Sequence, residues 1–127
     1  MNDDKHDPMT GGVEVADLRR PASGQTLERD DLADSPIQQF ETWLRDACAS
    51  EALDPNAMSV STVGDDGRPS CRMVLLKYYD EKGFVFFTNY GSRKASQIKV
   101  NPEVALLFPW FSMGRQVSVT GSASRIS

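Results

Sequence analysis

Histidine and cysteine are scarce in this chain of 127 residues, which holds one histidine, His6, and two cysteines, Cys48 and Cys71. A Ser-His-Asp triad, a Cys-His pair and a histidine-based metal site each need a histidine inside the folded part. His6 lies in a polar, acidic leader, so we expect none of these sites. The cysteines form no Cys-x-x-Cys pair, which predicts two reduced thiols. An enzyme built from these residues would need a cofactor for the difficult step.

Long apolar runs and a basic excess are also missing. No segment approaches the roughly 20 apolar residues of a membrane-spanning helix, and residues 1–7 are polar and acidic, unlike a signal peptide. The formal charge is −4. Residues 1–34 contain nine acidic and four basic side chains, whereas residues 35–127 contain nine acidic and ten basic ones. Because nucleic-acid binding needs a basic face, we predict a cytoplasmic protein that binds neither nucleic acid nor membrane.

One folded domain is expected from the length of the chain. Residues 1–34 mix Asp, Gly, Pro, Ser and Thr with few apolar side chains. This composition is typical of a flexible leader, with short order expected around residues 13–20. Residues 35–127 are predicted to fold as one unit. The pair Arg19–Arg20 stands out in the acidic leader, and its plain interpretation is two solvated charges.

A helix is predicted directly after the leader. Ser35 can cap it, Pro36 suits the first helical position, and Gln38 would complete a capping box. Apolar side chains then recur at helical spacing and predict a stripe that faces the core. The stripe consists of Ile37, Phe40, Trp43, Leu44, Ala47 and Cys48. Cys48 is thus expected in the core, and the sequence Asp54-Pro55-Asn56 is expected to end the helix.

From residue 57 the pattern changes to short segments rich in β-branched residues, which favour strands. Strands are predicted at residues 58–63, 70–79, 84–88, 103–111 and 115–124, with a short helix at 93–100. Turn sequences at residues 64–67 and 80–83 join the first three strands into a meander. Gly121 suggests a bulge or bend in the last strand. The order favours a mainly β fold, a small antiparallel barrel whose end or flank is covered by the first helix, at residues 35–50.

The segment from Arg72 to Lys77 is an apolar strand with a cation at each end. Charged side chains in such a strand need partners. The alternation of a strand places positions 72 and 77 on opposite faces. One ligand could contact both only if a bulge or twist intervenes or if it wraps the strand edge. The alternative is two cations that reach solvent from the ends of the strand.

A second feature is the sequence Asn89-Tyr90-Gly91-Ser92-Arg93-Lys94, a glycine-containing turn directly before a helix. Free N–H groups at a helix start favour an anion. Arg93 and Lys94 in the first turn oppose the helix dipole. Cations at that position are explained if a phosphate lies between them and the helix start. The other interpretation is two solvated charges.

Gln116 is a third candidate, at the start of the last predicted strand and on the same face as Ser118. An amide both donates and accepts hydrogen bonds, which suits the edge of a flavin ring. The alternative is a surface glutamine. Trp110 and the aromatic group at residues 84–87 are expected in the core rather than as stacking platforms.

Taken together, these segments resemble the pyridoxine/pyridoxamine 5′-phosphate oxidases. The matching blocks are Arg72-Met73-Val74-Leu75-Leu76-Lys77, Phe87-Thr88-Asn89, Gly91-Ser92-Arg93-Lys94-Ala95, Leu106-Leu107-Phe108-Pro109-Trp110 and Arg115-Gln116-Val117. Their order and spacing agree with the family. The resemblance covers roughly residues 35–127, and more weakly the leader from Leu18.

The resemblance implies an FMN-binding split barrel that forms a homodimer with FMN at the subunit interface. Residues 72–77 would line the FMN, and Phe87 and Thr88 would contact it from the next strand. Arg93 and Lys94 would hold its phosphate, and Gln116 would reach the flavin of the partner subunit. Lys77 would also contact the substrate phosphate. Arg19 and Arg20 match a leader motif that folds over the substrate.

The reaction implied by the resemblance is the oxidation of pyridoxine or pyridoxamine 5′-phosphate to pyridoxal 5′-phosphate. A hydride would pass from C4′ of the substrate to flavin N5, and oxygen would reoxidise the flavin to give hydrogen peroxide. The protein would supply orientation and positive charge, which agrees with a chain that has no usable histidine.

The sequence departs from the family at both ends. It stops at Ser127, where family members continue with more flavin contacts, an Arg-x-His substrate motif and much of the dimer surface. In the leader, Ala22 stands in place of a substrate-contacting tyrosine, and residues 27–31 replace a basic stretch. The resemblance therefore supports FMN binding more strongly than oxidase activity. An incomplete barrel would expose a strand edge and apolar surface, so we expect the chain to be marginally stable or to associate unless a partner completes the sheet.

Three alternatives to a vitamin B6 phosphate oxidase follow from these departures. The first is a non-catalytic split-barrel module that binds FMN or pyridoxal phosphate. The second is a structural, dimerising fragment without a cofactor. The third is a split-barrel reductase with another flavin-type cofactor, whose phosphate site would look much the same.

Overall fold

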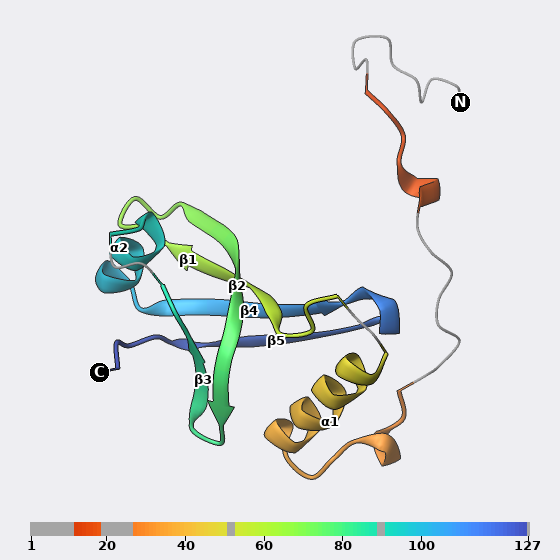
Figure 1. Ribbon diagram of the computed structural model, residues 1–127. Coiled ribbons are helices and arrows are strands. Elements are labelled where there is room, and N and C mark those ends of the chain that lie inside the picture. The colour runs from red at the N-terminus through yellow and green to blue at the C-terminus, as the bar shows by residue number, and fades with distance from the viewer. Residues whose placement is uncertain (1–11, 19–26, 51–52, 89–90, 127) are drawn as a thin grey trace.

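A computed structural model describes residues 12–18, 27–50, 53–88 and 91–126. Its centre is a five-stranded antiparallel sheet, with helix α1 near one end and helix α2 near the other (Figure 1). The elements in chain order are η2 (Ala16–Leu18), η3 (Arg29–Asp31), α1 (Pro36–Ala49), β1 (Ala57–Val63), β2 (Pro69–Asp80), β3 (Gly83–Phe86), α2 (Arg93–Val100), β4 (Glu103–Trp110), η4 (Phe111–Met113) and β5 (Arg115–Ser122). The mainly β fold class and the predicted bounds of α2 are confirmed.

Strand β1 lies at the centre of the sheet, between β2 on one side and β4 on the other. Hairpins add β3 beside β2 and β5 beside β4, so β3 and β5 are the edges of the described sheet. The sheet curves into a half-barrel (Figure 1). Gly121 pairs with Val104 in an unbroken register. Of the bulge or bend suggested at Gly121, the bulge is therefore wrong, because β4 and β5 pair residue for residue.

Helix α1 begins where the sequence predicts. Ser35 Oγ accepts the N–H of Gln38 at 3.1 Å, and Pro36 occupies the first turn. Gln39 binds the backbone ahead of the helix, where its Oε1 accepts the Ala33 N–H at 2.7 Å. The cap is confirmed. The reciprocal bond from the Ser35 N–H to Gln38 is not among the hydrogen bonds of the described residues, and the bond of Gln39 goes to a different backbone group, that of Ala33.

The end of α1 agrees with a helix over residues 35–50, but the side chain predicted to face the core in its last turn does not. The helix stops at Ala49, before Asp54, which has a left-handed φ of 48° and accepts the Ala57 N–H at 2.9 Å. Cys48 is exposed, so its expected place in the core is wrong. Ala47 is fully buried and takes the inward position. One further residue of helix turns the side chain by about 100° and carries Cys48 toward solvent.

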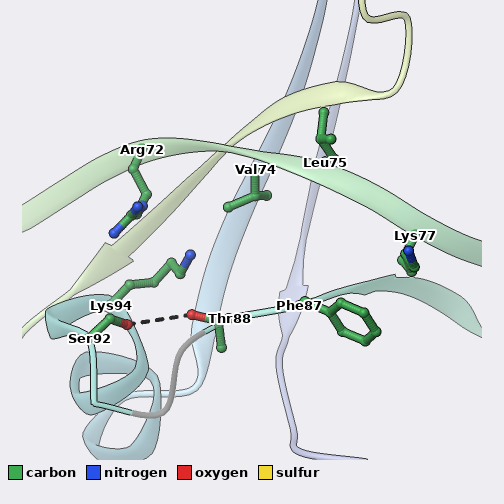
Figure 2. Close-up of a pocket in the computed structure, with 8 residues that line it drawn as sticks. All are labelled: Arg72, Val74, Leu75, Lys77, Phe87, Thr88, Ser92 and Lys94. Carbon is green, nitrogen blue, oxygen red and sulfur yellow. Dashed lines mark hydrogen bonds between the residues drawn. The ribbon is translucent and has the colours of Figure 1, made fainter.

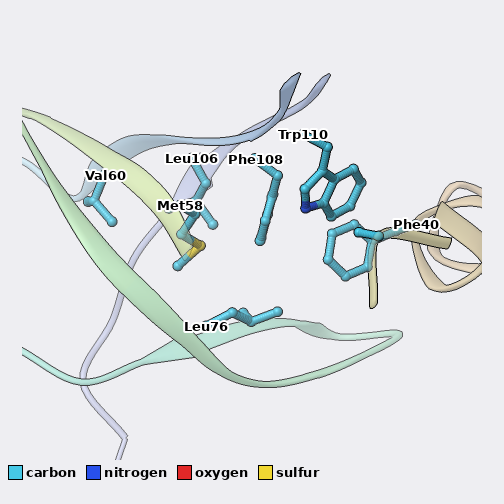
Figure 3. Packing of buried hydrophobic residues seen from close by; sticks show 8 residues of the cluster. Phe40, Met58, Val60, Leu76, Leu106, Phe108 and Trp110 are labelled. Carbon is cyan, nitrogen blue, oxygen red and sulfur yellow. The ribbon is translucent and has the colours of Figure 1, made fainter. Parts of the chain in front are cut away.

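The core fills the space between α1 and the inner face of the sheet (Figure 3). Its buried apolar residues are Phe40, Ala47, Met58, Val60, Leu76, Leu106, Phe108 and Trp110. The Phe40 ring packs edge-on against Phe108, with 4.9 Å between centroids, and against Phe84, with 5.1 Å. Trp110 donates its indole N–H to the Pro55 carbonyl at 2.8 Å. The core position predicted for Trp110 is confirmed, and α1 is anchored by aromatic contacts.

Residues 12–18 and 27–34 lie outside this core, and their side chains are exposed. They carry the two short 3₁₀ turns, η2 and η3. Among the helices in the described part of the chain, none has the length and apolarity needed to cross a membrane.

Candidate functional site

A pocket of about 360 Å³ lies where β3 ends and the chain leaves the sheet toward α2 (Figure 2). Its lining consists of Arg72, Val74, Leu75, Lys77, Phe87, Thr88, Ser92 and Lys94. The β2–β3 pairing stops at Leu76 and Phe86. The part of β2 that precedes Leu76 therefore has no β3 partner, and this open stretch of strand edge forms one wall of the pocket.

A bulge in β2 explains how this strand lines the pocket at both ends. Leu76 pairs with Phe86 but Tyr78 pairs with Val85, which leaves Lys77 as an extra residue. A bulge re-aims the side chain of the extra residue and shifts the alternation that follows. Regular alternation would place the Arg72 and Lys77 side chains on opposite faces of β2. The bulge, together with the free strand edge, brings both side chains to one pocket. Of the alternatives that the sequence left open, the bulge is the one observed.

Lys94 is the central cation of the site. Its side chain is only 6% exposed, and it lies next to Arg72; the two side chains point toward each other in Figure 2. Burial lowers the pKa of the Lys94 ammonium, and the neighbouring Arg72 guanidinium lowers it further. The Lys94 Nζ atom lies 5.8 Å from the centroid of the Phe86 ring, a weak compensation for lost hydration.

No acidic side chain balances this charge within the part of the chain that the structure describes. The eight lining residues include three cations and no carboxylate. The ion pairs among described residues are Arg45–Glu41, Arg68–Asp66 and Arg115–Asp46. Burying a cation without a partner is costly. An anion in the pocket would remove that cost.

The start of α2 adds hydrogen-bond donors to the same pocket. Ser92 caps the helix, and its Oγ accepts the Ala95 N–H at 3.1 Å. The Thr88 hydroxyl lies 3.5 Å from the Ser92 hydroxyl. The N–H groups of residues 93 and 94 precede the first intrahelical bond, which Ser96 donates to the Ser92 carbonyl at 3.1 Å. Such free N–H groups favour an anion at the helix start.

The far end of the pocket is more apolar. Phe87 is 73% exposed, and the Lys77 Nζ atom lies 5.1 Å from the centroid of its ring. Val74 points into the pocket, whereas the Leu75 side chain lies on the other side of β2 (Figure 2). The site therefore combines a cationic end, suited to a phosphate, with exposed apolar surface suited to a flat ring.

The profile of the family described as pyridoxamine 5′-phosphate oxidase matches residues 44–127. The chain belongs to this family. The pyridoxine/pyridoxamine 5′-phosphate oxidase of Rippkaea orientalis is 55% identical over 115 residues, which are 91% of this chain and 54% of that protein. The protein of the same name from Escherichia fergusonii is 54% identical over 114 residues, 90% of this chain and 52% of that one. The chain thus spans about half the length of the curated relatives it matches.

Two solved structures share the fold of this chain. PhzG from Burkholderia lata, in complex with tetrahydrophenazine-1-carboxylic acid, superposes with a TM-score of 0.76 at 27% identity, over 84% of this chain and 52% of that one. A pyridoxamine 5′-phosphate oxidase-related, FMN-binding protein from Nostoc punctiforme has a TM-score of 0.60 at 20% identity, over 72% and 47%. The half-barrel of this chain is therefore the split-barrel fold of the family.

The structure gathers some of the predicted site residues and leaves others apart. Those that line the pocket are Arg72, Val74, Leu75, Lys77, Phe87, Thr88 and Lys94. Leu76 is buried in the core, and Met73 is exposed beside it on β2. Because β3 ends at Phe86, Phe87 and Thr88 follow the strand rather than belong to it. Phe87 is exposed, so the core position expected for it is wrong.

Three further predictions lie away from the pocket or outside the described part. Arg93 is exposed at the start of α2, next to Lys94 but not in the pocket lining. Gln116 is exposed on β5 and alternates with the half-buried Val117, so it points away from the inner face of the sheet. Arg19 and Arg20 lie outside the described residues, and their role stays a prediction.

Sequence reasoning missed a buried polar group behind the pocket. Gln97 on α2 is 8% exposed, and Ser70 Oγ donates to its Oε1 at 2.6 Å. The Thr62 hydroxyl, on β1, donates to the same oxygen. The signal available in the sequence was the spacing of three between Lys94 and Gln97, which places both on one face of a helix.

Proposed function

We propose that this chain binds FMN and holds its phosphate at the cationic end of the pocket. The observation that carries the proposal is the buried Lys94 ammonium, placed beside Arg72 without a described carboxylate. A phosphate monoester carries a charge of about −1.5 to −2 at neutral pH and offers several acceptor oxygens. It would compensate both cations and accept the free N–H groups at the start of α2.

The residues of the pocket have distinct parts in this proposal. Lys94 and Arg72 hold the phosphate from inside, and Arg93 contacts it from the rim of the helix start. Thr88 and Ser92 offer hydroxyl groups beside it. The strand segment 72–77 would run along the flavin, with Leu76 behind it in the core and Met73 exposed, and Phe87 would border the ring. Gln116 points away from the inner face of its own sheet, as a residue that reaches the flavin of a partner subunit would.

We further propose that the chain contributes to the oxidation of pyridoxine or pyridoxamine 5′-phosphate, because relatives at about 54% identity carry that name. When bound, FMN supplies the chemistry of this reaction, the acceptance of a hydride from the substrate and reoxidation by oxygen. Lys77, at the apolar end of the pocket, would hold the substrate phosphate, and Arg19 and Arg20 would cover the substrate. The chain's own residues thus bind and orient, and they keep positive charge beside the reacting ring.

A homodimer is the assembly that fits this site. Met73 and Leu75 are 55% and 54% exposed on β2, and Phe87 is more exposed still. Exposed apolar side chains on β2 and at the pocket indicate a surface that a partner covers. A second copy would bring its own Gln116 toward the flavin.

A titration of the ligand-free full chain with FMN tests the proposal. We expect saturable binding, seen as quenching of flavin fluorescence. Riboflavin, which lacks the phosphate, should bind far more weakly, and inorganic phosphate should compete with FMN. Equal affinity for riboflavin and FMN would contradict a phosphate-binding role for Lys94 and Arg72.

Oxidase activity is tested separately with the FMN-loaded chain. Release of hydrogen peroxide on addition of pyridoxine 5′-phosphate would support catalysis by the chain. Tight FMN binding without peroxide would instead favour the non-catalytic module. A B6 vitamer without the phosphate is the matched control, because it removes the group that Lys77 is proposed to hold.

A further inference from the structure

Helix α2 is held against the sheet by polar side chains. Its two buried residues are Lys94 and Gln97, which lie three positions apart and therefore on the same face of the helix. Helices usually dock through an apolar stripe. Here one end of the buried face is a cation that lines the pocket, and the other end is an amide that contacts the sheet.

The Gln97 amide joins α2 to two neighbouring strands. Its Oε1 accepts the hydroxyl of Ser70 on β2 at 2.6 Å and the hydroxyl of Thr62 on β1. Thr62 and Ser70 are paired across the two strands, and their hydroxyl oxygens lie 3.5 Å apart. Thr62 is only 1% exposed. Buried hydrogen bonds are directional and costly to leave unmade, so they define one position of the helix.

The hairpin between β1 and β2 leaves room for this amide. A Cβ atom added at Gly64 would lie 3.2 Å from Gln97 Nε2 and 3.1 Å from Asp66 Oδ1. A side chain at position 64 would therefore press against the amide group. The absence of a side chain at Gly64 is a second feature that sets where Gln97 can lie.

The same strand serves both ends of the buried face of α2. Ser70 and Arg72 are two residues apart on β2, ahead of the bulge, and so lie on the same side of the strand. Ser70 binds Gln97, while Arg72 faces Lys94. The contact between Ser70 and Gln97 therefore determines how far apart Arg72 and Lys94 lie.

We propose that Gln97 is a positioning residue of the anion pocket. Its hydrogen bonds to Thr62 and Ser70 set the depth and rotation of α2, and this places Lys94 inside the pocket beside Arg72. The identity of the ligand, FMN, rests on the proposed function above. The position of Lys94 does not, because it can be measured in the ligand-free chain.

The experiment compares Gln97→Met, which keeps the side-chain volume but removes the amide, with Gln38→Met, the same change at an exposed site of α1. The pKa of Lys94 is read by NMR titration of isotopically labelled lysine in the ligand-free full chain. The affinity for FMN and the thermal unfolding are measured alongside. In Gln97→Met we expect the pKa of Lys94 to rise toward the ordinary lysine value, because the ammonium gains solvent and moves from Arg72. The affinity for FMN should fall about tenfold, and Gln38→Met should change neither.

Thr62→Val is the second variant, because it removes one hydroxyl at nearly constant volume and keeps Gln97. We expect smaller changes of the same kind in the pKa of Lys94 and in the affinity for FMN. When Thr62→Val is combined with Gln97→Met, the effects of the two substitutions should be less than additive. A lower melting temperature with unchanged Lys94 pKa and unchanged FMN affinity, in either variant, would overturn the proposal and leave Gln97 a stabilising residue only. A Lys94 pKa that responds to Gln97→Met in a chain without FMN affinity would support the positioning role and contradict FMN binding.

Discussion

The Lys94 ammonium and the Arg72 guanidinium lie next to each other in one pocket, and the guanidinium contributes to the lowered pKa of Lys94. Neither takes part in an ion pair among the described residues. Two like charges held together without a carboxylate lower the stability of the ligand-free chain. Such a loss is typical of a binding site, where a ligand supplies the missing charge.

Removal of the buried cation should weaken FMN binding without lowering the stability of the chain. In Lys94→Met we expect FMN affinity to fall by about 10- to 100-fold, since charge-assisted hydrogen bonds are each worth roughly 1.5–3 kcal/mol. The ligand-free chain should melt at the same or a higher temperature, because an unpaired buried charge is gone. Lys99→Met is the control, since Lys99 is an exposed cation on the same helix. Equal loss of affinity in both variants would assign the effect to net charge alone.

The lowered pKa of Lys94 predicts a pH dependence. Above the lowered pKa the ammonium loses its proton, so FMN affinity should decrease with rising pH before the ordinary lysine pKa of 10.5 is reached. Between the lowered pKa of Lys94 in the folded chain and the ordinary pKa of lysine, the unfolded chain binds more protons than the folded chain. The free energy of unfolding of the ligand-free chain should therefore rise with pH in this range. Lys94→Arg keeps its charge throughout. Fluorescence titrations should therefore show the alkaline decrease in the native chain and not in this variant.

Gly64 should tolerate a side chain poorly although it lies in a turn. In Gly64→Ala the added methyl group would press on the Gln97 amide, which two hydroxyl groups hold in place. We expect weaker FMN binding and a free energy of unfolding lower by about 1 kcal/mol. Gly121→Ala is matched to it, because nothing lies within 4 Å of its Cβ position. Urea titrations that rank the two variants equally would contradict the crowding at Gly64.

The aromatic contact of α1 should dominate stability. Phe40 is 2% exposed and packs against Phe84 and Phe108, so Phe40→Ala should cost about 3–5 kcal/mol. Phe111 is 80% exposed, and Phe111→Ala should change the free energy of unfolding by less than about 0.5 kcal/mol. Denaturant unfolding measures both. A small effect of Phe40→Ala would show that α1 is not anchored through this ring.

Local patterns in the sequence were enough to predict most of the elements and part of the site. The cap of α1 at Ser35, the bounds of α2 and the hairpin order of the strands follow from short-range rules. The conflict between the first turn of α2 and its dipole predicted an anion site there, and Lys94 lines the pocket. These features depend on residues a few positions apart, so sequence alone contains them.

Features that depend on distant contacts were decided only by the tertiary structure. The alternation of β2 predicted opposite faces for Arg72 and Lys77, and pairing with β3 introduced the bulge that changes this. The helical stripe placed Cys48 in the core, but α1 presents Ala47 instead. The contact of Gln97 with Thr62 spans 35 positions. The sequence by itself determined which elements form and where charged side chains gather. Packing between elements determined which side chains meet, because burial, and not local propensity, sets the register of the strands and the rotation of the helices.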